Sequence, residues 1–95
     1  MNFEWDSEKE EMNIRKHGID FDTASHVFND RNRLEFYDKW HSFPTEDRFI
    51  VIGMVEDVLY VVYTEREDAI RLISARIATA KEKELYTYGN SKKEN

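Results

Sequence analysis

The chain has 95 residues, a length that fits one domain with a single modest core. It contains no cysteine, which excludes disulfide bonds and thiolate chemistry. Its 20 acidic and 14 basic residues give a formal net charge of −6, which argues against indiscriminate binding to nucleic acid but leaves room for a local cationic pocket.

No segment predicts export or insertion into a membrane. Residues 1–16 are charged and lack the apolar stretch of a signal peptide. The longest mostly apolar run, residues 49–63, is interrupted by Gly53, Glu56 and Asp57 and is too broken to cross a bilayer. We therefore expect a cytoplasmic protein that does not contact a membrane.

The N-terminal third predicts a short strand followed by two helices. Residues 3–5 alternate apolar and polar side chains, as a strand does. Asp6 can cap a helix that ends near His17, and Gly18 can adopt the left-handed conformation that closes many helices. A second helix is expected over about 21–28, where apolar residues recur at helical spacing.

The middle of the chain predicts four strands. Residues 34–36 alternate as a strand and are followed by a polar loop over 38–47. Three segments rich in β-branched residues come next and favour strands that are joined by short turns. These segments span 48–54, 58–65 and 69–76.

A final helix completes the predicted fold. Thr79 and Glu82 have the spacing of a capping box, and the helix is expected to end near Gly89. The order β-α-α-β-β-β-β-α predicts an α+β fold, with a small antiparallel sheet of about four strands plus a short N-terminal strand and with the helices packed on one face. We expect a single domain over 1–88 and a polar C-terminal tail over 89–95.

The first predicted helix carries a polar stripe. Lys9, Asn13 and His17 recur every four residues and therefore share one helix face, which either binds a ligand or is simply the solvated side. Histidine takes and gives a proton near neutral pH, and its cationic form is favoured at a helix C-terminus. His17 is thus a candidate general acid, or alternatively a cap on the last carbonyl groups of the helix.

Four arginines fall on the last three predicted strands and their turns: Arg48, Arg66, Arg71 and Arg76. Guanidinium groups pair with phosphate through two hydrogen bonds, so several of them in one groove would stabilise a pentacoordinate phosphorane. Arg71 and Arg76 are separated by an odd number of residues and cannot line one pocket unless a bulge intervenes. The alternative is that these arginines form ion pairs with neighbouring carboxylates.

Aromatic residues are candidates for contacts with bases or with a partner. Residues that could stack on unpaired bases are Phe36, Trp40, Tyr60 and Tyr63, although aromatic residues in strands are more often part of the core. Trp40, Phe43 and Tyr37 surround the polar loop and could anchor a partner protein, or could cover the core.

Metal and cofactor sites are not indicated. His17, His26 and His41 have no close metal-ligand spacing. The chain also has no glycine-rich phosphate loop. We therefore expect neither a metal nor a cofactor.

Several short motifs occur in a characteristic order and spacing along the chain. They are Phe3-Glu4-Trp5-Asp6, Lys9, Asn13, Lys16-His17-Gly18-Ile19, Phe21 with Ala24, Val27-Phe28-Asn29-Asp30, His41-Ser42, Glu46-Asp47-Arg48-Phe49, Ile52-Gly53, Thr64-Glu65-Arg66, Arg71-Leu72-Ile73-Ser74-Ala75-Arg76 and Ala78-Thr79. Together these motifs, which cover residues 2–88, resemble the BrnT toxins of bacterial toxin–antitoxin pairs.

The resemblance implies a RelE-like fold and a partner. BrnT toxins are ribonucleases neutralised by BrnA-type antitoxins, which carry a ribbon-helix-helix DNA-binding part. A similar chain would cleave RNA and inhibit translation. It would be a dimer within the toxin–antitoxin complex, and this complex would contact operator DNA only through the antitoxin.

On this basis we expect a metal-independent endoribonuclease. Such an enzyme activates the ribose 2′-hydroxyl, neutralises the phosphorane and protonates the departing 5′-oxygen. We expect His17 to transfer protons, with Glu65 as a lesser candidate base, and Arg48, Arg66 and Arg76 to hold phosphate. The residues expected to contact RNA more broadly are Lys9, Asn13, Lys16 and Arg71.

A binding module is the rival hypothesis. Such a domain would only hold a DNA-binding antitoxin and tune repression of the operon. In that case the arginines would be consumed by neighbouring carboxylates, and an acidic face would meet a basic partner segment, which the charge of −6 would favour.

Overall fold

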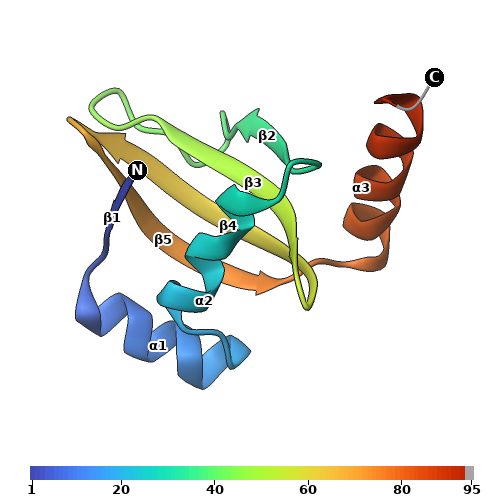
Figure 1. Ribbon diagram of the computed structural model, residues 1–95. Coiled ribbons are helices and arrows are strands. Elements are labelled where there is room, and N and C mark those ends of the chain that lie inside the picture. The colour runs from blue at the N-terminus through green and yellow to red at the C-terminus, as the bar shows by residue number, and fades with distance from the viewer. Residues whose placement is uncertain (94–95) are drawn as a thin grey trace.

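A computed structural model describes residues 1–93 and shows one five-stranded sheet with helices on both sides (Figure 1). The strand order is β1-β5-β4-β3-β2; β1 runs parallel to β5, and the other neighbours are antiparallel. The elements are β1 (Asn2–Glu4), α1 (Ser7–His17), α2 (Phe21–Ser25), the 3₁₀ helix η1 (His26–Asn29), β2 (Leu34–Tyr37), β3 (Arg48–Val55), β4 (Asp57–Arg66), β5 (Ala69–Ile77) and α3 (Ala80–Lys93). The predicted α+β fold and its element order are confirmed, and the sheet is mixed because β1 is parallel to its neighbour.

Both ends of α1 are set by the residues that the sequence indicates. The Asp6 side chain accepts a hydrogen bond from the Glu8 N–H at 3.0 Å, which satisfies one of the free donors of the first turn. Gly18 has a φ of 71° and donates its N–H to the Ile14 carbonyl at 2.7 Å. A side chain at this φ would be strained, so glycine ends the helix here.

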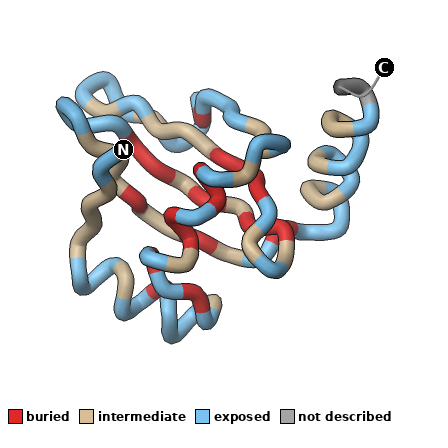
Figure 2. Tube along the Cα trace, in the orientation of Figure 1, coloured by how far each residue is buried: buried red, intermediate tan, exposed pale blue. Residues whose placement is uncertain are grey.

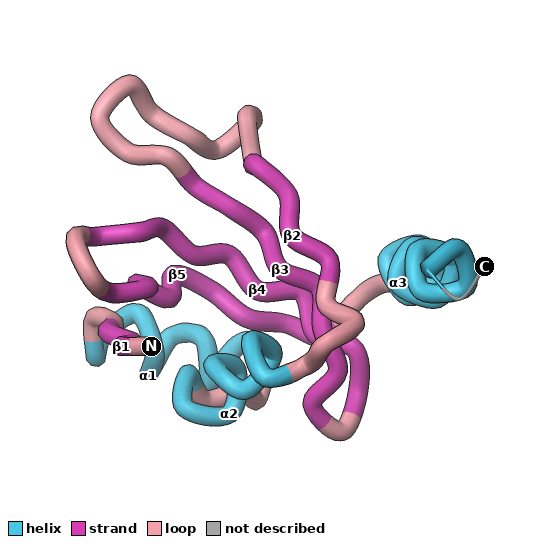
Figure 3. The backbone as a smooth tube through the Cα atoms, turned by 45° about the horizontal axis from the view of Figure 1, so that its top comes forward, coloured by secondary structure: helices cyan, strands magenta, loops and turns pink. Residues whose placement is uncertain are grey.

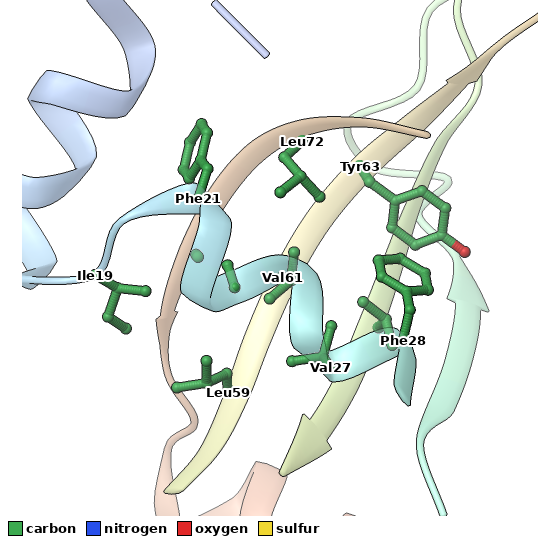
Figure 4. Close-up of a cluster of buried hydrophobic side chains, with 11 residues drawn as sticks. Ile19, Phe21, Val27, Phe28, Leu59, Val61, Tyr63 and Leu72 are labelled. Carbon is green, nitrogen blue, oxygen red and sulfur yellow. The ribbon is translucent and has the colours of Figure 1, made fainter. Parts of the chain in front are cut away.

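The main core lies between the sheet and the segment that forms α2 and η1 (Figure 4). Phe21, Val27, Val51, Val61 and Leu72 are fully buried in or near its centre. Burial of each such side chain stabilises the fold by roughly 1.5–3 kcal/mol. Figure 2 shows the buried residues concentrated along the central strands and the segment that crosses them, whereas the outer side of α1 is exposed.

A β-bulge interrupts the pairing of β4 with β5. Val62 is paired with Ser74, whereas the next residue, Tyr63, is paired with Leu72. Ile73 is therefore the extra residue on β5, and the alternation of side chains between the two faces shifts by one at this point. The consequence is that residues on either side of Ile73 that differ by an odd number share a face.

The final helix begins as predicted but is longer and lies elsewhere. Thr79 and Glu82 form the capping box, with N–H donors at 2.8 and 3.2 Å from the partner side chains. The helix α3 continues through Gly89 to Lys93, so most of the tail expected over 89–95 is helical, and residues 94–95 lie outside the described residues.

The three helices do not share one side of the sheet, contrary to the prediction. Figure 3 shows α1 and α2 together on one side and α3 apart from them. Tyr86 of α3 packs with Ile52, on the other side of the sheet from the main core, and its hydroxyl donates to Asp30 at 2.5 Å. Among the described residues, no helix is long and apolar enough to span a membrane.

Candidate active site on the open face of the sheet

The sheet face opposite α1 and α2, called the open face below, is covered by α3 only at one end. Residues that are paired across neighbouring strands point to the same face. Strand pairing therefore assigns three rows of side chains to the open face of β3, β4 and β5: Arg48–Thr64–Arg71, Ile50–Val62–Ser74 and Ile52–Tyr60–Arg76.

The bulge at Ile73 brings the arginines of β5 to one face. Without it, Arg71 and Arg76 would point in opposite directions. With it, Arg71 is paired with Thr64 and Arg76 with Tyr60, both on the open face. Arg66 lies two residues beyond Thr64 on β4 and shares this face by alternation.

A cleft of about 280 Å³ lies on the open face beneath the loop that joins β2 to β3. Its walls come from this loop and from the three central strands, so segments distant in the sequence meet here. The lining residues are Asp38, His41, Arg48, Tyr60, Val62, Ile73, Ser74 and Arg76.

The loop places a histidine beside a buried carboxylate. His41 Nδ1 lies 2.9 Å from Asp38 Oδ2; the Asp38 side chain is 4% exposed and the imidazole 71% exposed. When Nδ1 carries the proton it donates to Asp38, which leaves Nε2 free as an acceptor. This arrangement orients an accessible imidazole for proton transfer.

Backbone hydrogen bonds hold this pair in place. The Asp38 N–H donates to the Arg48 carbonyl at 2.8 Å, and the Asp38 carbonyl accepts from the Ser42 N–H at 3.1 Å and from its hydroxyl at 2.7 Å. The Ser42 hydroxyl also accepts from the Arg48 N–H at 2.9 Å. The first half of the loop is thus tied to the start of β3.

Arg48 offers free donors to the cleft. Its Nε bonds to Glu46 at 3.0 Å, and its guanidinium carbon lies 5.0 Å from the centroid of the Phe43 ring. Within residues 1–93, neither Nη group of Arg48 has a hydrogen-bond partner. These two groups are therefore available to an anion such as phosphate.

Arg76 is instead held in the wall of the cleft. Its two Nη atoms bond to the Glu82 carboxylate at 2.7 and 2.9 Å, and its guanidinium carbon lies 4.0 Å above the ring of Tyr60. The hydrogen bond to Glu82 raises the pKa of Arg76, and the same bond lowers the pKa of Glu82. Both groups are thus charged at neutral pH.

Tyr60 remains protonated beneath Arg76. Burial raises the pKa of its hydroxyl, and the negative charges of Asp38 and Glu82 raise it further. The cleft therefore combines a phenol donor, an oriented imidazole and a guanidinium group with free donors. Such a set of groups can bind a phosphodiester and move a proton beside it.

Comparison with known proteins identifies the family. A model of the ribonuclease toxin BrnT of type II toxin–antitoxin systems matches residues 5–82. The chain belongs to the BrnT family. It is a ribonuclease toxin of a type II toxin–antitoxin system, and the cleft lies wholly within the matched residues.

A solved structure supports this assignment. The fold is similar to the crystal structure of the Brucella abortus ribonuclease toxin BrnT, with a TM-score of 0.67 and 27% sequence identity. The match covers 83% of this chain and 97% of that chain. No curated protein matches this chain significantly in sequence.

The geometry corrects the predicted grouping of His17 with the arginines. His17 ends α1, which packs on the side of the sheet opposite the open face, so this imidazole does not meet the arginines that line the cleft. The imidazole that does meet them is His41. The sequence prediction did not select His41 because it lies in a polar loop, although its spacing of three from Asp38 was a signal.

Asn13 is part of the fold rather than of an exposed stripe. Its amide donates to the carbonyls of Ile19 and Ala75 at 3.0 and 2.8 Å and accepts from the Ala75 N–H at 3.0 Å. These bonds tie α1 to β5, and the side chain is buried. Lys9 and Lys16, by contrast, are exposed on α1.

The remaining predicted residues lie at the end of the sheet where β4 turns into β5, with Arg66 and Arg71 on the open face and Glu65, which is paired with Ile70, on the core side. Glu65 and Arg66 line a second hollow of about 300 Å³ beside the same loop, with Thr45, Glu46, Asp47, Phe49 and Thr64. Arg71 pairs with Glu4 of β1 at 2.8 Å. Arg66 forms no ion pair with any residue in 1–93, so it is an unpaired cation at the rim.

Proposed function

We propose that the cleft on the open face is the active site of a metal-independent endoribonuclease. The observation that carries the proposal is the His41–Asp38 pair, which faces the same cleft as the free donors of Arg48. A phosphodiester bound in this cleft would have a proton acceptor and a positive charge among the residues around it.

The reaction has two proton transfers and one bond exchange. His41 Nε2 takes the proton of the ribose 2′-hydroxyl as that oxygen attacks the adjacent phosphorus. The bond from phosphorus to the 5′-oxygen breaks, which leaves a 2′,3′-cyclic phosphate and a 5′-hydroxyl. The departing oxygen takes up a proton from Tyr60, which lines the cleft, or from solvent.

Asp38 serves as a positioning residue. Its carboxylate fixes the ring orientation and the tautomer of His41 and stabilises the imidazolium that forms after proton uptake. Because Asp38 is itself buried and bonded through its backbone, the imidazole keeps this orientation before the substrate arrives.

Arg48 is the main phosphate ligand in this proposal. Its Nη groups neutralise the charge on the phosphorane, and loss of one preorganised donor of this kind costs roughly 10²–10³ in rate. Arg76 is held by Glu82 and shapes the cleft through Tyr60. Arg66 and Arg71 lie on the same face and contact neighbouring phosphates of the RNA strand.

The decisive experiment compares two histidines in an RNA cleavage assay. His41→Ala is expected to lower kcat at least 100-fold, since positioned acid–base catalysis contributes roughly 10²–10⁴. His17→Ala, the matched control on α1, is expected to keep the activity of the parent. The reverse result would contradict the proposed site. Cleavage is expected to be unchanged in EDTA, and loss of activity with chelator would overturn metal independence.

We extend the proposal to the partner. The antitoxin is of the BrnA-like ribbon-helix-helix type, binds the toxin as a dimer and carries all contacts with operator DNA. The toxin acts in the cytoplasm, where it cleaves RNA and inhibits translation. Co-purification followed by a gel-shift assay tests the assembly: operator binding is expected only when the antitoxin is present, and binding by the toxin alone would refute it.

A further inference from the structure

The loop that carries His41 also presents an unusually exposed tryptophan. Trp40 is 83% exposed, whereas the other tryptophan, Trp5, packs edge-on against Phe21 at 6.0 Å between ring centroids. The exposed indole lies one residue before His41 and two residues after the buried Asp38. It therefore lies between two loop residues, Asp38 and His41, that line the cleft.

Trp40 is exposed on a loop that hydrogen bonds hold in place. The bonds of Asp38 and Ser42 fix the first half of the loop, and Phe43 and Glu46 form a β-bridge that closes its tip with N–H···O distances of 2.8 and 3.1 Å. An indole that remains in water forgoes the stabilisation that burial of a large aromatic ring brings. An ordered loop that holds it there fits a surface for a ligand.

The charge around the ring indicates the kind of ligand. Lys39 Nζ lies 5.3 Å from the centroid of the Trp40 ring, and Arg48 lines the cleft beneath the same loop. A flat apolar ring beside cations suits a partner with a flat π face and a negative charge. An unpaired nucleotide has both, and a base stacked on an aromatic side chain is a recurrent mode of single-strand recognition.

We propose that Trp40 is a stacking platform for an unpaired base next to the scissile phosphate, with Lys39 beside the phosphate of that nucleotide. This rests on the proposed active site at His41, because the platform adjoins that cleft. It makes the toxin selective for single-stranded RNA, since a base within a duplex cannot offer its face to the indole. Trp40 acts on binding and does not take part in proton transfer.

The binding test uses the fluorescence of Trp40. In a Trp5→Phe background Trp40 is the sole indole, and a single-stranded 2′-O-methyl RNA that cannot be cleaved is titrated against it. We expect quenching that saturates, and no quenching with the same strand annealed to its complement. If Trp5→Phe fails to fold, subtracting the signal of Trp40→Phe from that of the parent gives the same measurement.

The kinetic test uses the full chain with cleavable RNA. Trp40→Ala is expected to raise KM about 10-fold with little change in kcat, as loss of one base–aromatic stack predicts. Trp40→Phe should recover most of the affinity because it keeps a π face. Met12→Ala, which removes an exposed apolar side chain on α1, is the matched control and is expected to leave KM unchanged.

The outcomes separate this inference from the proposed site. If His41→Ala abolishes cleavage but Trp40→Ala changes neither KM nor quenching, the platform is refuted and the active site stands. If quenching occurs but His41→Ala remains fully active, the active site is refuted and the platform loses its role in catalysis. If Trp40→Ala weakens only the binding of the antitoxin, the indole is a protein contact and the inference is overturned.

Discussion

His41 and Asp38 differ strongly in solvent exposure, and this difference indicates the role of each residue in the proposed site. The imidazole is accessible to a substrate, whereas the carboxylate is buried and has no route to RNA except through the imidazole. A group in the position of Asp38 acts by orienting its neighbour. Its effect should thus be seen in the rate of proton transfer and not in the affinity for RNA.

Asp38→Asn tests this role at nearly constant shape. The amide can present its N–H₂ group to His41 Nδ1, which favours the tautomer whose Nε2 carries the proton and is no longer a base. We expect kcat to fall about 100-fold, as for loss of a general base, with KM within a factor of two. The pH profile of kcat should also change.

A second loop carboxylate provides the control. Asp47 lines the neighbouring hollow and accepts a weak hydrogen bond from Tyr37 at 3.3 Å. Asp47→Asn therefore changes the same loop by the same chemistry without touching His41, and kcat should be retained. Equal losses in the two variants would indicate disturbance of the loop and contradict a specific role for Asp38.

Asn13 shows that one member of a polar helical stripe can be buried and hold the fold together. Asn13→Ala removes three buried hydrogen bonds and leaves backbone groups of Ile19 and Ala75 without partners, which should lower the free energy of unfolding by about 3 kcal/mol. Lys9→Ala, one turn away and exposed, should change it by no more than about 0.5 kcal/mol. Urea unfolding measures both, and a stable Asn13→Ala protein with weakened RNA binding would restore the ligand role.

At the scale of elements, the sequence predicts the fold far better than the site. Caps at Asp6, Gly18 and Thr79 are local signals, and the structure confirms them. The bulge at Ile73 has no comparable local signal, because it is defined by the partner strand, and it decides which face Arg71 and Arg76 share. The alternation of side chains along a strand predicted only that Arg71 and Arg76 could not share a face without a bulge.

The position of the helices has the same non-local origin. The pattern of a short helix indicates that it packs on the sheet but not on which side. The side taken by α3 is set by contacts between residues far apart in the sequence, such as Tyr86 with Asp30 and Lys83 with Asp57. The side taken by α1 likewise places His17 away from the cleft. The sequence alone therefore grouped the arginines with a histidine that does not line their cleft.

The hydrogen bond from Tyr86 to Asp30 helps to hold α3 against the rest of the protein, and its contribution to stability depends on pH. Burial and the hydrogen bond to Asp30 raise the pKa of Tyr86 to about 12, above the value of about 10 for a tyrosine in an unfolded chain. The stabilisation is therefore complete below pH 10 and is lost as the pH rises through about 12. The folded protein favours the neutral phenol.

Tyr86→Phe removes this hydrogen bond and keeps the aromatic ring. At pH 9 we expect the free energy of unfolding to fall by about 1 kcal/mol, the modest value of a partly exposed hydrogen bond. The difference from the parent should shrink as the pH approaches 12. The pKa of Tyr63 is also raised, mainly by burial, but this residue is common to both proteins and cancels in the difference. Glu84→Gln, on the exposed side of α3, serves as the control. If the stability difference between Tyr86→Phe and the parent did not vary with pH, this role of the hydrogen bond would be contradicted.

For the molecule as a whole, a net charge of −6 is compatible with the proposed binding of RNA because acidic and basic residues lie on different sides of the sheet. The first turns of α1 are acidic, whereas Arg48, Arg66, Arg71 and Arg76 all lie on the open face. Three of these four arginines are paired with carboxylates, which lowers the charge that the face presents to solvent. If the proposed site is correct, RNA is expected to approach this face, with weak attraction at long range.

The dependence of binding on salt distinguishes this face from α1. Each phosphate contact on single-stranded RNA adds about −0.7 to the slope of log K against log salt concentration. Arg66→Gln removes an unpaired cation from the rim of the open face, so the slope for an uncleavable RNA should become shallower by about 0.7, the value of one contact. Lys16→Gln removes an equally exposed cation from α1 and should leave the slope unchanged, because that helix lies on the opposite side of the sheet. If Lys16→Gln lowered the slope and Arg66→Gln did not, RNA would approach along α1, and the open face would not be its binding surface.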